Sequence, residues 1–297
     1  MSALEVGRVT MRHPEKVMYP STGTTKGELV DYLRAVAGPL LAQLRDRPVT
    51  RVRLPDGMGG ERFFEKNVPR GAPLWLRHQT LRAAPGGPDE GKTLDLPFLD
   101  ELDALVWALN LGALELHTPQ WRVGPRGGVR APDRFVVDLD PGPPAGLAEC
   151  AHVARLVAAR LRADGLEPVP VTSGSKGIQL YAPLAGSADV MRVHAYGREL
   201  ARSLAAEHPG LILATSSRED RTGRVFIDWS QNHPAKTTIT PYSLRARELP
   251  NVAAPRRWDE LDDPGLAQLD FRAVARRVEA DSDLYPWDAA GGALPWV

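Results

Sequence analysis

Hydrophobic positions follow two different periods along the chain, and the changes of period predict a mixture of helices and strands. Apolar residues recur near the helical period over residues 26–44, 99–114, 146–163, 190–207 and 268–280. Short runs rich in β-branched and aromatic residues predict strands at 48–54, 62–66, 134–140, 168–171, 178–181, 211–214 and 224–229. The Gly/Pro-rich segment 84–92 predicts a loop, and 249–257 predicts a connector. The pattern indicates an α/β (α+β) chain.

Two of the predicted strands carry carboxylates. Asp138 and Asp140 are two residues apart in Phe-Val-Val-Asp-Leu-Asp, so a strand would point both to one face. Asp228 ends a similar run, and three carboxylates would meet if the two strands are neighbours. Such oxygen ligands suit hard divalent cations, and a pair of cations can stabilise the attacking and leaving oxygens of phosphoryl transfer. Asp-x-Asp is also common by chance, and the Pro-Gly-Pro-Pro after Asp140 is equally typical of a strand that ends in a turn.

Two further segments carry groups suited to phosphate. In Val-Thr-Ser-Gly-Ser-Lys-Gly (171–177), exposed turn amides with Ser173 and Lys176 would form an anion nest, although an ordinary Gly-Ser hairpin has the same composition. After Asp228, a polar stretch contains Gln231 and Arg245, which could reach a nucleotide; most such stretches are solvated surface loops.

Composition limits the classes of protein to consider. The chain has 297 residues, 43% of them hydrophobic, and no apolar run near the roughly 20 residues that span a bilayer. A single cysteine, Cys150, and no recognisable export signal predict a cytoplasmic protein without a membrane partner. The 37 basic and 37 acidic residues argue against sequence-blind coating of DNA, but basic clusters at 45–70 and 215–247 allow a modest number of phosphate contacts.

Seven motifs together resemble one known family. In chain order they are His-Pro-Glu-Lys-Val-Met-Tyr-Pro (13–20), Arg-Phe-Phe-Glu-Lys-Asn (62–67), Glu-Leu-His-Thr-Pro-Gln-Trp (115–121), Asp-Leu-Asp-Pro-Gly (138–142), Thr-Ser-Gly-Ser-Lys-Gly (172–177), Asp-Trp-Ser-Gln-Asn (228–232) and Pro-Tyr-Ser-Leu-Arg (241–245). Their order and spacing resemble the primase-polymerase domain of bacterial DNA ligase D, in the archaeo-eukaryotic primase superfamily. The resemblance runs from about Thr10 to about Asp283.

The resemblance implies a fold and a reaction. It implies a central mixed, largely antiparallel sheet flanked by helices. It also implies one catalytic domain over 1–297, with a DNA-end part at about 1–130, a metal and nucleotide core at about 131–250 and a C-terminal part at 251–297. Asp138, Asp140 and Asp228 match ligands of two divalent cations, manganese or magnesium. The nucleoside-triphosphate contacts match Ser173, Lys176, His117, Arg221, Gln231 and Arg245. From its sequence position alone, His117 would be interpreted as a core histidine.

The resemblance also implies contacts with DNA ends. Lys16 and Lys26 match residues that hold a 5′-phosphate at a gap or break, and Phe63 and Phe64 match an aromatic pair that stacks on bases. Core packing is the alternative for the phenylalanines, since adjacent strand residues face opposite sides. Arg53 is assigned to the same DNA-binding set. The implied partners are gapped or broken double-stranded DNA with a 5′-phosphate, a DNA ligase and an end-binding protein at the bacterial nucleoid.

The chain departs from the family at two positions that bear on activity. Gln179 stands where the family usually has a histidine, and Val52 where relatives often have a lysine. The hypothesis is a repair primase-polymerase that fills short gaps or extends ends, and the resemblance alone implies that it prefers ribonucleotides. The alternative is a catalytically weakened module that tethers DNA ends for a partner ligase. A metal-dependent phosphodiesterase would leave the Ser-Lys turn and the arginines without a role. The chain is either a free-standing enzyme or one domain of a longer protein.

Overall fold

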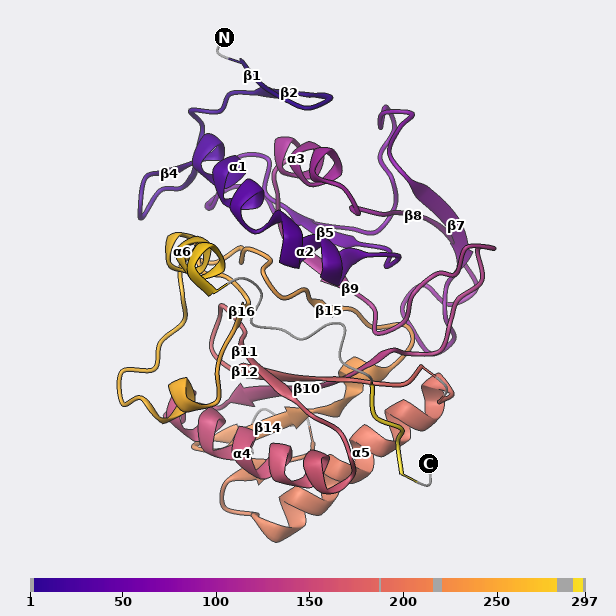
Figure 1. Cartoon of the computed structure of the whole chain (residues 1–297), viewed down its shortest axis with the longest axis vertical. Coiled ribbons are helices and arrows are strands. Elements are labelled where there is room, and N and C mark those ends of the chain that lie inside the picture. Colours follow the sequence, from indigo (N-terminus) through magenta and orange to yellow (C-terminus); the bar gives the residue numbers. More distant parts are fainter. Residues whose placement is uncertain (1–2, 187, 216–220, 282–290, 296–297) are drawn as a thin grey trace. The chain divides into compact units, whose positions relative to one another are not determined.

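The computed structural model describes residues 3–186, 188–215, 221–281 and 291–295, and the chain forms two compact units (Figure 1). The first unit contains residues 1–118, 239–253 and 269–284. The second unit contains residues 119–238, 254–268 and 285–297. Each unit therefore combines segments that are far apart in the sequence. Among the described residues, no helix is both long and apolar enough to cross a membrane.

A six-stranded sheet is the framework of the second unit. Its strands, in spatial order, are β13 (Ile212–Leu213), β14 (Val225–Asp228), β10 (Arg134–Pro141), β12 (Ile178–Pro183), β11 (Val169–Thr172) and β16 (Ala254–Pro255). Among these described strands, β13 and β14 run parallel and the remaining neighbours run antiparallel. The prediction of a mixed, largely antiparallel sheet is confirmed.

Two long helices cover one face of this sheet. α4 (Leu147–Ala163) packs on β10 and β12, and α5 (Val190–Glu207) packs beside it on β10 (Figure 1). The apolar residues that meet the helices alternate along each strand: Phe135, Val137 and Leu139 on β10, Ile178, Leu180 and Ala182 on β12, and Val225 and Ile227 on β14. Because strand residues alternate between faces, the intervening residues point to the opposite face.

The first unit is built from helices and small sheets. Its helices are α1 (Lys26–Ala35), α2 (Ala37–Leu44), α3 (Leu102–Asn110) and α6 (Phe271–Asp281). A four-stranded sheet has the order β15 (Thr238–Ile239), β9 (Ala113–Thr118), β5 (Thr50–Arg53) and β6 (Phe63–Glu65). Three hairpins pair β1 (Ala3–Val6) with β2 (Val9–Arg12), β3 (Val17–Tyr19) with β4 (Thr24–Thr25), and β7 (His78–Arg82) with β8 (Thr93–Pro97). Two short 3₁₀ helices, η2 (Trp229–Asn232) and η3 (Asp259–Asp262), belong to the second unit.

The single helix predicted over 26–44 is wrong in one respect, because α1 ends and α2 begins around Val36. Thr25 caps α1: its side chain accepts a bond from the Glu28 N–H, and the Glu28 side chain accepts one from the Thr25 N–H. Pro39 explains the break. A proline inside a helix removes a backbone donor and clashes with the preceding turn, but it is tolerated in a first turn, which is where α2 places it.

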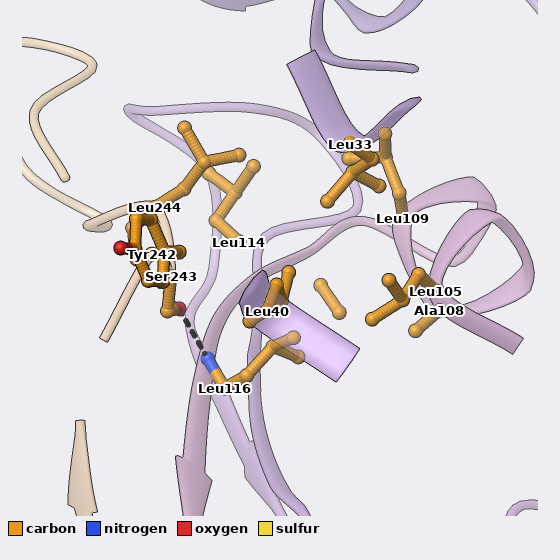
Figure 2. A pocket seen from close by; sticks show the side chains of 11 residues that line it. Leu33, Leu40, Leu105, Ala108, Leu109, Leu114, Leu116, Tyr242, Ser243 and Leu244 are labelled. Atoms are coloured by element: carbon orange, nitrogen blue, oxygen red, sulfur yellow. Dashed lines mark hydrogen bonds between the residues drawn. The ribbon is translucent and has the colours of Figure 1, made fainter. Parts of the chain in front are cut away.

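The leucine-rich core of the first unit encloses a void of only about 10 Å³. Figure 2 shows Leu33, Leu40, Leu109 and other apolar side chains around it. One polar feature is the Ser243 hydroxyl, which accepts a 2.9 Å hydrogen bond from the Leu116 N–H. This volume is close to the smallest that holds one water molecule. The void is therefore a packing defect of the core, too small for a substrate.

Candidate active site

The three predicted carboxylates lie on one face of the second unit's sheet. Asp138 and Asp140 lie between the residues of β10 that pack against the helices, so they point to the opposite face. Asp228 ends β14 with the same alternation. Asp138 is the direct cross-strand partner of Asp228, and Asp140 is the partner of Phe226. The strands are therefore neighbours, as the sequence analysis required.

The carboxylates at the centre of this face already accept hydrogen bonds. The Gln179 amide donates to Asp138 Oδ1 at 3.2 Å, and the Gln231 amide donates to Asp228 Oδ2 at 2.8 Å. Asp228 Oδ1 accepts from the Ser230 N–H at 3.1 Å and from the Ser230 hydroxyl. Gln179 lies opposite Asp138 on β12, which places a neutral donor on one side of Asp138 and Asp228 on the other.

The donor set suits a hard cation, although its oxygens do not yet converge. Within the described residues, no three His, Cys, Asp or Glu side chains are grouped closely enough to hold a metal ion. All three aspartates are partly exposed and offer oxygen ligands of the kind that magnesium and manganese prefer. Two negative charges on neighbouring strands repel each other. A divalent cation would remove that repulsion, so the residues present fit such an ion.

The prediction of an anion nest at the Ser-Lys turn is wrong for three backbone amides, because these N–H groups already donate to side chains of the protein. The Ser175 and Gly177 N–H groups donate to the Ser173 hydroxyl, and the Gly174 N–H donates to the Gln268 side chain. Gly177 is required here because a Cβ at this position would lie 1.9 Å from the Leu139 carbonyl oxygen of β10. Lys176 is exposed at the tip of the turn. Phosphate binding at this turn would therefore depend on the Lys176 ammonium rather than on the backbone.

Arg221 lies next to the carboxylate face of the second unit. Its guanidinium carbon is 4.3 Å from the centroid of the Phe226 ring, and Phe226 is the cross-strand partner of Asp140. Gly142 permits this approach, because a Cβ there would lie 1.9 Å from the Arg221 carbonyl oxygen. The predicted triphosphate residue Arg221 is thus brought close to the predicted metal ligands by a tight backbone contact.

In the first unit, a buried carboxylate holds His117 and Arg245 together. Glu115 is 1% exposed, and its oxygens lie 2.8 Å from His117 Nε2, 3.2 Å from Arg245 Nε and 3.3 Å from an Arg62 nitrogen. The Ala246 N–H donates to it as well. The sequence analysis missed Glu115. The signal was present, because Glu115 and His117 are two residues apart on β9 and so share a face.

The charge of Glu115 is well stabilised. Burial alone would raise the pKa of its carboxyl group, but the hydrogen bond with His117, the charges of Arg245 and His117 and the Ala246 N–H outweigh it. The pKa is lowered to about 2. Glu115 is therefore a permanent anion among three basic side chains, and this leaves an excess of positive charge for an external anion.

Lys16 and Lys26 are adjacent in the first unit. The Lys26 N–H donates to the Lys16 carbonyl at 2.8 Å. The buried Lys26 ammonium donates to the carbonyl oxygens of Arg12 and Asn110, and the Lys16 ammonium donates to the Pro55 carbonyl at 2.6 Å. Burial lowers the pKa of Lys26, and the charge of Lys16 lowers it further. Both ammonium groups therefore already donate to backbone carbonyl oxygens, and Lys26 is buried.

The side chains of Phe63 and Phe64 are both exposed, at 37% and 60%, so the expectation that one packs inward is wrong. They lie on β6, which is an edge strand of the four-stranded sheet. The Phe64 ring is 6.3 Å from His117 in an edge-on arrangement. Arg53, by contrast, donates to the Leu111 carbonyl and pairs with Glu65, so its guanidinium is committed to internal contacts.

We expect Phe64→Ala to weaken binding to gapped DNA by about 1–3 kcal/mol, or about five- to a hundredfold in Kd, because one aromatic ring stacks on one base with roughly that free energy. Fluorescence anisotropy with a labelled gapped duplex measures the change. Met191→Ala removes a similarly exposed apolar side chain from α5 of the second unit and serves as the control. Equal Kd values for the wild type and Phe64→Ala would contradict the stacking role.

Comparisons with known proteins all point to one family. The family model "LigD, primase-polymerase domain" matches residues 25–285. The chain is 43% identical over 289 residues to the multifunctional non-homologous end joining DNA repair protein LigD of Mycobacterium tuberculosis, covering 96% of this chain and 37% of that protein. It is 33% identical over 285 residues to LigD of Pseudomonas aeruginosa, covering 95% of this chain and 33% of that protein. The chain thus spans about a third of the length of these curated relatives.

A solved structure extends the similarity to the fold. The polymerase domain from Mycobacterium tuberculosis ligase D, in complex with DNA, matches with a TM-score of 0.88 and 42% identity, covering 93% of this chain and 96% of that one. The chain belongs to the primase-polymerase domain family of LigD, a family of nucleotidyltransferases. The resemblance inferred from the motifs is confirmed.

Proposed function

We propose that this chain is a template-dependent nucleotidyltransferase that fills short gaps or extends DNA ends in non-homologous end joining. The observation that carries the proposal is the direct pairing of Asp138 and Asp228 on neighbouring strands, with Asp140 on the same face. Family membership supports the reaction class, and LigD relatives named for end joining support the repair setting. As predicted from the sequence, the chain would act as one catalytic domain on DNA of the bacterial nucleoid.

In this proposal the three aspartates would hold two divalent cations, manganese or magnesium. When bound, these cations would supply Lewis-acid stabilisation to the attacking and leaving oxygens. Binding of the triphosphate is assigned to Ser173, Lys176, Arg221, His117 and Arg245, with Gln231 as a further polar contact. The 3′-hydroxyl of a primer attacks the α-phosphorus, and pyrophosphate leaves. We propose a preference for ribonucleotides on the basis of the family resemblance.

We propose that Lys16 and Lys26 bind the 5′-phosphate of a gap and that Phe63 and Phe64 stack on its bases. The backbone contact between the two lysines, the effect of the Lys16 charge on Lys26 and the two exposed rings support this assignment. Arg53 contributes charge to the same unit, although its guanidinium is occupied by Glu65 and Leu111. A DNA ligase and an end-binding protein are the expected partners, because the chain matches only part of longer end-joining proteins.

A primer-extension assay on a gapped duplex tests the activity. We expect the wild type to add one or a few nucleotides in the presence of Mn²⁺, with ribonucleotides added faster than deoxyribonucleotides. A duplex without the 5′-phosphate should bind more weakly and be extended less. Equal rates with both nucleotide types would contradict the ribonucleotide preference alone. Absence of extension with every nucleotide and either metal would contradict the polymerase assignment.

The second candidate is a DNA-end binding module with little catalysis. One observation favours it: the lysines and phenylalanines of the first unit are arranged for binding, whereas among the described residues no three-ligand metal group is assembled. The same gapped duplex separates the two functions. Tight binding that depends on the 5′-phosphate, without nucleotide addition, would favour the module over the polymerase.

A further inference from the structure

The two facing carboxylates of the second unit are each held by a glutamine. Gln179 donates its amide hydrogen to Asp138, and Gln231 donates its amide hydrogen to Asp228. Asp138 and Asp228 are direct cross-strand partners, so the two glutamines hold the two members of one pair.

Each glutamine oxygen accepts a hydrogen bond from a buried hydroxyl. The Tyr181 hydroxyl donates to Gln179 Oε1 at 3.1 Å, and the Thr238 hydroxyl donates to Gln231 Oε1 at 3.3 Å. Tyr181 is fully buried and Thr238 is 3% exposed. Two relays therefore have the same order, in which a hydroxyl donates to a glutamine and the glutamine donates to an aspartate.

The hydroxyl anchors the end of the amide that lies away from the carboxylate. A glutamine side chain has a donor end and an acceptor end, and an ionised carboxylate only accepts. The carboxylate therefore sets the direction of the amide, because a reversed amide would place its oxygen against a carboxylate oxygen. The hydroxyl then gives the amide oxygen a partner and holds the outer end of the side chain in place. Loss of that partner would leave a buried amide oxygen without a hydrogen bond, which is costly.

The same buried arginine lies behind both relays. Arg134 Nε donates to Gln120 Oε1 at 2.6 Å, and Gln120 Nε2 donates to the Thr238 hydroxyl oxygen at 2.8 Å. The Thr238 oxygen accepts from Gln120, and its hydroxyl donates to Gln231. The Arg134 guanidinium carbon is also 5.5 Å from the centroid of the Tyr181 ring. Arg134 is thus linked to one relay through Gln120 and lies near the tyrosine of the other.

We propose that Tyr181 and Thr238 are positioning residues that orient Asp138 and Asp228 for divalent cations through Gln179 and Gln231. The inference rests on the proposed function in one respect, because it takes these aspartates as the cation ligands. It assigns to Gln179, which departs from the family pattern, the task of fixing the Asp138 carboxylate.

Hydroxyl-deletion variants of the full chain test the proposal. Tyr181→Phe and Thr238→Val each remove one donor and keep the size of the side chain. Outer residues that orient metal ligands typically contribute about ten- to a hundredfold to metal affinity, so we expect Kd for Mn²⁺ alone to rise about tenfold in each variant. Isothermal titration calorimetry with Mn²⁺, without DNA or nucleotide, measures this affinity directly.

Two matched variants separate positioning from general destabilisation. Thr238→Ser restores the hydroxyl and should restore the affinity for Mn²⁺. Tyr196→Phe removes another buried tyrosine hydroxyl of the same unit, one that donates to Asp164 at 2.6 Å, and should leave the affinity unchanged. Wild-type affinity in both Tyr181→Phe and Thr238→Val would overturn the proposal, as would a Thr238→Ser variant no tighter than Thr238→Val.

Primer extension with the same proteins distinguishes this proposal from the proposed function. Weakened Mn²⁺ binding in the two deletion variants, with no extension by the wild type, would support the relays and contradict the polymerase. If the wild type extends primers normally and the two deletion variants bind Mn²⁺ as tightly as the wild type, the result would support the polymerase and overturn the relays. If the wild type did not bind Mn²⁺, the proposal that the relays orient cation ligands would be overturned.

Discussion

Replacing Asp138 and Asp140 together by alanine is expected to reduce nucleotide addition by about a thousandfold or more. Metal-ion stabilisation of a phosphoryl-transfer transition state is worth several kcal/mol, and about 4 kcal/mol corresponds to a factor of about a thousand in rate. The double variant removes two of the three proposed oxygen ligands from the face of β10 opposite the helices, while leaving Phe135, Val137 and Leu139 packed under the helices. Single-turnover primer extension with saturating Mn²⁺ measures the rate.

The control for this experiment is a carboxylate of the same unit that lies away from the site. Glu167 pairs with Arg162 on the surface, so Glu167→Ala should extend primers at the wild-type rate. DNA binding by the double variant should also persist, because the predicted 5′-phosphate and stacking residues belong to the first unit. An unchanged extension rate in the double variant would refute the assignment of these aspartates as catalytic ligands.

The second large effect is expected at Glu115. We expect Glu115→Gln to lower the free energy of unfolding by about 3–5 kcal/mol, because removing one partner of a buried ion pair leaves the other charge without compensation. Here the charge left behind is the Arg245 guanidinium, and His117 loses its hydrogen-bond partner; both side chains are largely buried. Urea unfolding at neutral pH measures the change. We also expect weaker nucleotide binding, since both side chains would lose their common anchor.

An exposed ion pair provides the comparison for Glu115. Glu207 pairs with Arg160 at 2.8 Å, and both side chains are substantially exposed. Glu207→Gln should change the free energy of unfolding far less than Glu115→Gln does, as is usual for surface pairs. Equal, small effects of the two substitutions would show that Glu115 does not hold the cluster together.

The contribution of Glu115 should depend on pH in a defined direction. Its folded pKa of about 2 lies below the ordinary value of 4.5, so the folded state binds the proton less readily than the unfolded state. The stabilisation is then fully present above about pH 4.5 and declines as the pH falls toward 2. The difference in unfolding free energy between the wild type and Glu115→Gln, measured from pH 6 to pH 3, should shrink on acidification. A difference that grew on acidification would contradict this account.

The strands and helices with strong periodicity could be predicted from the sequence. The helix over 190–207 matches α5, and the strand over 134–140 matches β10 except for its last residue, because apolar alternation there coincides with burial against α4 and α5. The shared face of Asp138 and Asp140 followed from the same alternation. The pairing of their strand with the strand of Asp228 could not be predicted in this way, since strand order depends on contacts between segments that are far apart in the sequence.

Other features depend on tertiary contacts that local pattern does not record. The helix predicted over 99–114 is shorter, because Gly112 adopts a positive φ and β9 begins at Ala113. The hairpin of β7 and β8 was missed, because its two strands lie on the surface and lack a clear apolar face. The amides of the Ser-Lys turn were expected to be free, but the distant Gln268 accepts one of them. Hydrogen-bond partners that are far apart in the sequence can be identified only from the three-dimensional structure.

A crystal structure of the protein with Mn²⁺ and a nucleoside triphosphate tests the central claim most directly. The account predicts two ions bound by carboxylate oxygens of Asp138, Asp140 and Asp228, with the triphosphate bound beside them. Ions bound elsewhere, with the three carboxylates turned away from one another in the presence of nucleotide, would contradict it.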